Sequence, residues 1–191
     1  MGTSVSHRSP STPNWRVVET GYTREEIPID RLTQEILRAA TNQPEGNLLR
    51  DLSEPIVAEC LRIVEGANTR SAAIQQFRQV VALSGQTSLA AEIAQRAIVP
   101  TFQAVEERTS AFVRSLFSEA GNYLVSRDLP GFIGSGRLNN VSDAIAFKNN
   151  IRQQISQMVS EVFPPAKGLF EAAVWREYVD QVVSHILKGA S

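Results

Sequence analysis

Apolar side chains recur at spacings of three and four residues through most of the chain after residue 28, which is the period of one face of an α-helix. The longest run of this kind lies between residues 87 and 127. An alternating pattern typical of a strand competes only at residues 16–22. The pattern therefore predicts an all-α fold, a bundle of six to seven helices formed by residues 15–191 as one domain.

Turn and cap residues divide this pattern into separate helices. We expect helices at residues 28–41, 53–65, 69–84, 87–127, 141–162 and 169–187. Ser53 is expected to cap the second of them, with Pro55 in its first turn, where the missing amide is tolerated. Pro100 lies inside the longest pattern and removes one backbone hydrogen bond, so we expect a kink or a break there.

The first fourteen residues have a different composition from the rest of the chain. Residues 1–14 are rich in Ser, Thr and Pro and contain no carboxylate. Such a segment cannot bury enough apolar area to offset the entropy that is lost on ordering. We therefore expect a disordered N-terminal tail at 1–14, followed by the helical domain.

Charge and hydropathy limit the classes of partner. The formal net charge is -1, and the charges alternate along the chain instead of forming blocks, so no nucleic acid partner is expected. No apolar run approaches the length of a membrane span, and the N-terminus has no hydrophobic signal segment. These features indicate a cytoplasmic protein without a membrane span.

The residues that most often carry catalysis are scarce. Cys60 is the single cysteine, and the two histidines, His7 and His185, lie at opposite ends of the chain. Cys60 stands in an apolar helical stretch, so we interpret it as a small buried hydrophobe, not as a nucleophile. A Cys-His pair stays open as an alternative, although nothing in the pattern points to one.

The carboxylates do not form a reactive pair either. Neighbouring residues on a helix diverge by about 100 degrees, so the two carboxylates of an adjacent pair do not converge on one reacting atom. We therefore interpret Glu25-Glu26 and Glu106-Glu107 as solvent-exposed residues. The Glu-x-x-His motif of di-iron bundles does not occur. We therefore expect no enzyme activity, no catalytic residue, no metal site and no cofactor.

A glycine-rich segment at residues 128–137 has some features of a phosphate-binding loop. Its glycines let backbone amides approach an anion, and Arg137 is placed to pair with one. A P-loop, however, needs Lys-Ser/Thr after its last glycine and a strand before it, and neither is present. We interpret the segment as an interhelical connector with Phe132 as an apolar anchor. A partner-docking loop that uses Phe132 and Arg137 is the alternative.

The tail carries a second kind of chemistry. Removal of the initiator methionine leaves the amine of Gly2 free, and an α-amine with an ordinary pKa of about 7.7–8.0 is partly neutral and nucleophilic at cellular pH. Thr3, Ser4 and Ser6 can then lie extended in the groove of another protein. This indicates a modification acceptor. Gly2 and Ser6 also fit the N-myristoylation pattern, although one acyl chain gives only marginal membrane binding. A plain disordered end is the other interpretation.

The start Met1-Gly2-Thr3-Ser4, with the polar Pro-containing stretch that follows, resembles the QatB-like component of bacterial antiphage defence cassettes. Those proteins accompany an ATPase, a QueC-like enzyme and a TatD-type hydrolase. The resemblance implies that Gly2 accepts a deazaguanine-type conjugate from the QueC-like partner. It implies a non-enzymatic helical accessory protein whose partners are the modifying enzyme and other proteins of the cassette. An unmodified structural adaptor that binds a partner through its helices is the alternative.

Overall fold

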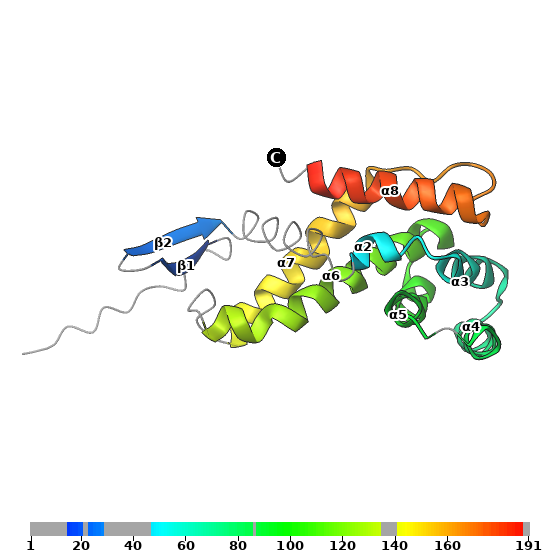
Figure 1. Cartoon of the computed structure of the whole chain (residues 1–191), viewed down its shortest axis with the longest axis horizontal. Helices are drawn as coiled ribbons and strands as arrows, with labels where there is room; N and C mark the ends of the chain where they lie inside the picture. Colours follow the sequence, from blue (N-terminus) through cyan, green and yellow to red (C-terminus); the bar gives the residue numbers. More distant parts are fainter. Residues whose placement is uncertain (1–14, 21–22, 29–46, 86, 135–140, 189–191) are drawn as a thin grey trace, which may run out of the picture.

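The computed structural model describes residues 15–20, 23–28, 47–85, 87–134 and 141–188 (Figure 1). Within residues 47–188 the described chain is helical, which confirms the predicted all-α fold class. The helices are α2 (Leu48–Asp51), α3 (Pro55–Gly66), α4 (Arg70–Ser84), α5 (Leu89–Gln103), α6 (Arg108–Gly134), α7 (Val141–Ser160) and α8 (Ala172–Lys188).

A two-stranded antiparallel hairpin precedes the helices. It consists of β1 (Trp15–Thr20) and β2 (Thr23–Pro28), paired in register from Trp15 with Pro28 to Thr20 with Thr23. β1 lies where the alternating pattern of residues 16–22 competed with the helical one. The expected tail at 1–14 lies outside the described residues, and so does the expected helix at 28–41 except for Pro28, which ends β2.

The start of α3 corrects one predicted cap. Glu54, not Ser53, occupies the N-cap position, with extended backbone angles of φ -56° and ψ 140° and no capping bond from its side chain. The residue before a proline is driven away from helical angles, so Pro55 fixes the helix start one residue later than expected. The carboxylate of Glu54 instead accepts a hydrogen bond of 2.6 Å from the hydroxyl of Ser88, the N-cap of α5.

The ends of α4 lie where the sequence placed them. The hydroxyl of Thr69 accepts a hydrogen bond of 3.2 Å from the backbone amide of Ala72, which satisfies one of the free donors of the first turn. Gly85 ends the helix at φ 62°, a left-handed conformation that favours glycine. Local cap chemistry thus marks both ends of this helix.

The sequence predicted a kink or a break at Pro100, and the helix does not break there. Helix α5 runs through Pro100 to Gln103, and the chain turns at Ala104, whose ψ is 149°. The ring removes only one backbone bond, while Ile98 and Thr101 on either side of it are buried and hold this turn against the body. Helix α6 then begins at Arg108.

The predicted connector at residues 128–137 is also wrong in its first half. Helix α6 continues through residues 128–134, including Pro130, and residues 135–140 lie outside the described part. The pairing of α6 with α7 is the most extensive contact between two helices. Tertiary packing of this kind overrides the weak helix propensity of Pro and Gly. A phosphate cradle is therefore not formed by residues 128–134.

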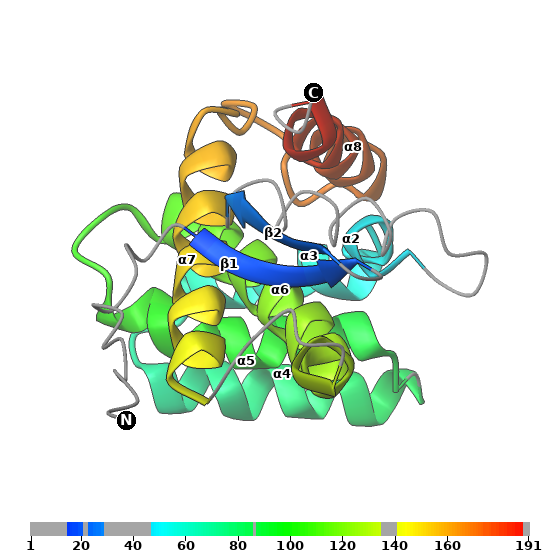
Figure 2. The same cartoon turned by 90° about the vertical axis from the view of Figure 1, so that its left-hand side faces the viewer.

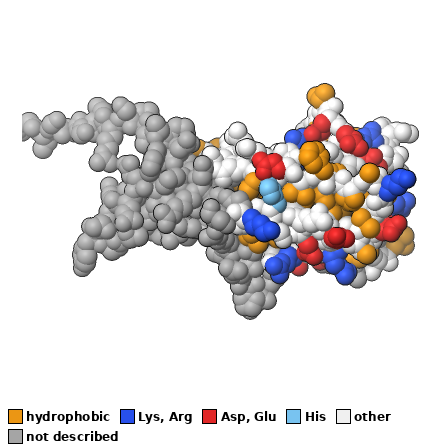
Figure 3. Space-filling model, turned by 90° about the horizontal axis from the view of Figure 1, so that it is seen from above, with side chains coloured by type: hydrophobic (Ala, Val, Ile, Leu, Met, Phe, Trp, Pro, Cys, Tyr) orange, Lys and Arg blue, Asp and Glu red, His pale blue; other side chains and the backbone are white. Residues whose placement is uncertain are grey.

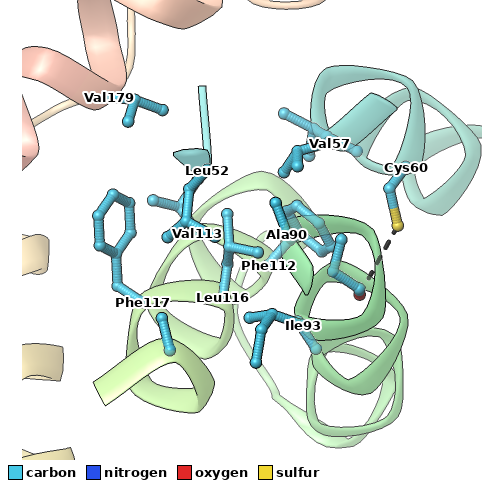
Figure 4. Packing of buried hydrophobic residues seen from close by; sticks show 14 of the residues in the cluster. Leu52, Val57, Cys60, Ala90, Ile93, Phe112, Val113, Leu116, Phe117 and Val179 are labelled. Carbon is cyan, nitrogen blue, oxygen red and sulfur yellow. Dashed lines mark hydrogen bonds between the residues drawn. The ribbon is translucent and has the colours of Figure 1, made fainter. Parts of the chain in front are cut away.

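Helix α6 lies in the middle of the bundle, with α7 beside it, α8 above it and α4 and α5 below it (Figure 2). Its buried side chains reach neighbours on several sides, and Figure 4 shows Phe112, Val113, Leu116 and Phe117 among residues of α3, α5 and α8. At the other end of the chain, the buried indole of Trp175 donates a hydrogen bond of 2.8 Å to the carbonyl of Leu52. This bond ties α8 to the turn that follows α2.

Candidate functional site

The connector between α7 and α8 carries two of the large apolar side chains that reach the described surface. Phe163 is 84% exposed and Phe170 is 45% exposed, and Pro165 and Ala166 between them are also exposed. We call these four side chains the connector surface. Seen from above, the face that carries α8 shows hydrophobic side chains between acidic and basic ones (Figure 3). Apolar patches rimmed by polar groups mark interaction sites on soluble proteins.

The sequence explains why the chain leaves the helical form here. Pro164 and Pro165 have no backbone N–H and cannot continue α7, so the helix ends at Ser160. Gly168 has a φ of 75°, which an L side chain rarely adopts, and its carbonyl accepts a hydrogen bond of 2.8 Å from the amide of Glu171. This turn directs the chain into α8.

The backbone of the connector is anchored, although its aromatic side chains are exposed. The hydroxyl of Tyr178 donates a hydrogen bond of 3.2 Å to the carbonyl of Val162, and Leu169 is buried. Nε2 of His185 lies 2.6 Å from Oε2 of Glu161, which joins the last turns of α8 to the end of α7. Phe163 and Phe170 each come directly after an anchored residue. The backbone therefore holds both rings at defined positions on the surface.

Two hollows lie beside this connector, and Val162 lines both. The first has a volume of about 740 Å³ and runs along the outer face of α8, past Ala173 and Ser184. The second has a volume of about 180 Å³ and lies between α6, the end of α7 and α8; Phe163 and Tyr178 line it. An exposed aromatic ring next to concave surface is the arrangement in which a partner chain buries an anchor.

A polar groove of about 350 Å³ continues from the smaller hollow along α6 and α7. Arg114 forms an ion pair with Glu106, and Arg152 lies 3.7 Å from Glu119. Each guanidinium faces a carboxylate, so these four side chains add no net charge to the groove. Ser118 lines it and is buried. The groove supplies a polar rim to the apolar connector surface.

The sequence-predicted site residues are not brought together by the described part of the chain. Phe132 lies in the last turns of α6, and its side chain is not among those described. Gly2, Thr3, Ser4, Ser6 and Arg137 all lie outside the described residues. The modification site and the proposed partner contacts of the tail therefore stay predictions.

Cys60 is the small buried hydrophobe that the sequence indicated. Its side chain is fully buried in α3, and its Sγ lies 3.7 Å from the carbonyl oxygen of Ala94 (Figure 4). Burial, aided by the negative charge of Glu59, raises the pKa of the thiol well above its ordinary value. The reactive thiolate is disfavoured under these conditions.

Sequence reasoning missed the connector surface. The expected helix at 141–162 ends just before residues 163–165, where two prolines follow one another. The available signal was the pair Phe163 and Phe170, two large aromatic residues inside a segment whose Pro and Gly content indicates a surface loop. Exposure distinguishes them from core residues, and exposure depends on the packing of α8.

None of the described helices combines the length and the hydropathy that a transmembrane segment requires. In the described ranges, no three His, Cys, Asp or Glu side chains are grouped as a metal site would need. Comparison of this chain with protein-family models, curated proteins and solved structures finds no match.

Proposed function

We propose that this chain is a non-enzymatic helical accessory protein that binds another protein through its connector surface and presents Gly2 to a modifying enzyme. The observation that carries the binding half is the 84% exposure of Phe163 next to two hollows. The resemblance of the first residues to QatB-like proteins supports the modification half, and with it a bacterial defence cassette as the source of the partners.

The composition of the connector surface supports a protein partner. An exposed phenyl ring gains free energy when it leaves water, at about 25 cal/mol for each Å² that is buried. Aromatic anchors in well-packed pockets supply most of the binding energy of protein interfaces. The ion pairs of Arg114 and Arg152 at the rim add orientation more than affinity. Phe163 is thus the anchor, and the polar groove defines the register of the partner.

The binding half is tested by co-expressing the chain with its native gene neighbours and isolating the complex. Phe163→Ser should abolish the complex and leave the unfolding midpoint unchanged, because the side chain makes few contacts within the chain. Ile145→Ser is the matched control, since Ile145 is also an exposed large aliphatic residue, 56% exposed, but lies on α7. Loss of the complex in both variants, or in neither, would refute the role of the connector surface.

The modification half rests on the chemistry of a free glycine amine. Gly2 has no side chain to crowd its nitrogen, and its ordinary pKa leaves a neutral nucleophilic fraction at cellular pH. Intact-mass and N-terminal peptide mass spectrometry on the co-expressed protein should show added mass on Gly2. The added mass separates a nucleobase-like conjugate from a fatty acyl chain. Gly2→Pro should then remove function without a change in thermal stability.

An unmodified adaptor is the second candidate, and the same observation at Phe163 favours it. It predicts that deletion of residues 2–14 leaves the complex and the function intact, while Phe163→Ser removes both. The modified accessory protein predicts that the same deletion keeps the complex but abolishes function. The two candidates therefore differ in one measurement on one truncated protein.

A further inference from the structure

Helix α4 buries much less of its apolar surface than its sequence provides. Ala73 and Phe77 are buried, and Ile74, Val80 and Val81 are half-buried and pack against the core, whereas Ser71, Gln75, Arg78, Gln79 and Ala82 on the other side are exposed. Leu83, in the last turn, is 88% exposed. The helix lies at the edge of the bundle and packs on α3 and α5 (Figures 1 and 2). One long side of α4 is therefore uncovered by the described part of the chain.

The uncovered side of α4 has the ridges and the groove of a surface that packs against another helix. Two rows of residues at spacing four form parallel ridges, and a groove of about 560 Å³ lies between them; the rows are Ile74, Arg78 and Ala82, and Ser71, Gln75 and Gln79. We call these six residues the α4 groove. Helices pack by placing the ridge of one into such a groove of the other, most often with both ridges at spacing four. The groove therefore fits another helix better than an extended peptide.

Charge selects the kind of helix. Helix α4 contains Arg70 and Arg78 and no carboxylate, and neither guanidinium forms an ion pair with any described residue. An unpaired guanidinium next to half-buried aliphatic groups is complementary to a carboxylate on a helix that also offers an apolar stripe. A second copy of α4 would place arginine against arginine, so this helix does not pair with itself.

We propose that the α4 groove docks an acidic amphipathic helix of another protein. The apolar stripe of that helix covers Ile74 and Ala82, and its flanking carboxylates pair with Arg78. This surface is separate from the connector surface, and the inference does not rest on Phe163 or Gly2. It gives the chain two faces for two partners, which suits a protein that joins components of one assembly.

The test uses the full chain and a labelled synthetic peptide as the probe. The peptide has leucines along one face of a helix and glutamates on both flanks, and a second peptide replaces each glutamate with lysine. Fluorescence anisotropy should show saturable binding of the acidic peptide that weakens as salt is raised, and no binding of the lysine peptide. Arg78→Glu should weaken binding by at least about tenfold, because like charges then face one another.

Matched variants separate the groove from net charge and from folding. Arg176→Glu makes the same charge change at an exposed arginine of α8 and should leave the affinity unchanged. Arg78→Lys keeps the charge and should retain binding. Circular dichroism should show that all three variants fold, since both arginines are exposed.

Three results would overturn the proposal. The first is no binding of the acidic peptide, and the second is equal weakening by Arg78→Glu and Arg176→Glu, which would reduce the effect to overall charge. The third is self-association of the chain that Arg78→Glu disrupts, because the occupant would then be a second copy. Phe163→Ser should not change peptide affinity in any case, so failure here and failure of the connector surface remain distinct.

Discussion

The guanidinium of Arg108, in the first turn of α6, donates a hydrogen bond to the carbonyl of Ala67, the C-cap residue directly after α3. The same nitrogen lies 3.1 Å from the carbonyl oxygen of Val64. Its carbon Cζ lies 4.6 Å from the centroid of the Phe102 ring, within the range of a cation–π contact. One side chain therefore caps the end of α3, begins α6 and packs on the end of α5.

Arg108→Ala should lower the free energy of unfolding by about 1–3 kcal/mol, because part-buried carbonyls lose a charged donor. Urea denaturation measures the change. Arg62→Ala is the control, since Arg62 forms an exposed pair with Glu59 one turn away on the same helix, and it should cause a clearly smaller loss because solvent screens that pair. Equal losses in the two variants would contradict the capping role of Arg108.

Gly121 permits the close approach of α6 and α7. A Cβ at this position would lie 2.2 Å from Cδ1 of the buried Ile155. Gly121→Ala should destabilise the protein by about 1 kcal/mol or more, even though alanine is the better helix former. Ile155→Val removes the obstructing methyl, so the double variant should be more stable than the sum of the two single changes predicts.

The control for this glycine is Gly66, at the end of α3. A Cβ there meets nothing within 4 Å. Gly66→Ala should be neutral or should stabilise the protein by up to about 1 kcal/mol, because it restricts the unfolded chain. Thermal unfolding of the two alanine variants side by side checks the difference, and a destabilised Gly66→Ala would show that helix backbone, not packing on Ile155, governs both.

Cys60 should be unreactive in the folded protein. Burial raises the pKa of its thiol and also keeps reagents away, so iodoacetamide at neutral pH should label it only in denaturant. Mass spectrometry of native and denatured samples measures the labelling. Rapid alkylation of the native protein would mean that α3 and α5 open locally around Ala94.

Tyr178 should make the protein less stable at alkaline pH. Burial raises the pKa of its hydroxyl from an ordinary value of 10.0 to about 12, so the folded state keeps a proton that the unfolded state loses. Its contribution to stability is therefore complete below pH 10.0 and is lost as the pH rises towards about 12. Tyr178→Phe should flatten the fall in stability over this range.

The tyrosine test is best made in a Cys60→Ala background. The pKa of the thiol is also raised by burial, from an ordinary value of 9.0, so Cys60 adds a fall in stability of the same sign that begins at lower pH. Chemical denaturation across the alkaline range, with and without Tyr178→Phe, isolates the hydroxyl. An unchanged slope would show that the tyrosine titrates alike in both states.

The sequence predicted the ends of a helix correctly where those ends depend only on residues that are close in the chain. Thr69 and Gly85 define α4 because a hydroxyl cap and a left-handed glycine need no tertiary partner. Pro100 does not end α5, because its lost bond is outweighed by the burial of Ile98 and Thr101. The prediction for residues 128–134 was wrong because they continue α6, and the pairing of α6 with α7 is not visible in composition.

The candidate site was harder to predict from the sequence than the fold. A periodic pattern cannot separate Phe163, which is exposed, from Phe117, which is fully buried, because both are large apolar residues near helical runs. The same limit applies to α4, whose predicted stripe is buried at Phe77 and half-buried at Val80. Which apolar residues stay uncovered is a property of the assembled bundle and not of any one helix.

The hydrogen bond between Trp175 and Leu52 joins residues that are 123 positions apart. During synthesis, the carbonyl of Leu52 reaches its partner only after α8 has left the ribosome. Helix α2 also packs on α5 and α6, so only its contacts with α8 have to form last. A nascent chain stopped before Trp175 would leave exposed the residues that α8 covers, so the last helix to be made completes the core.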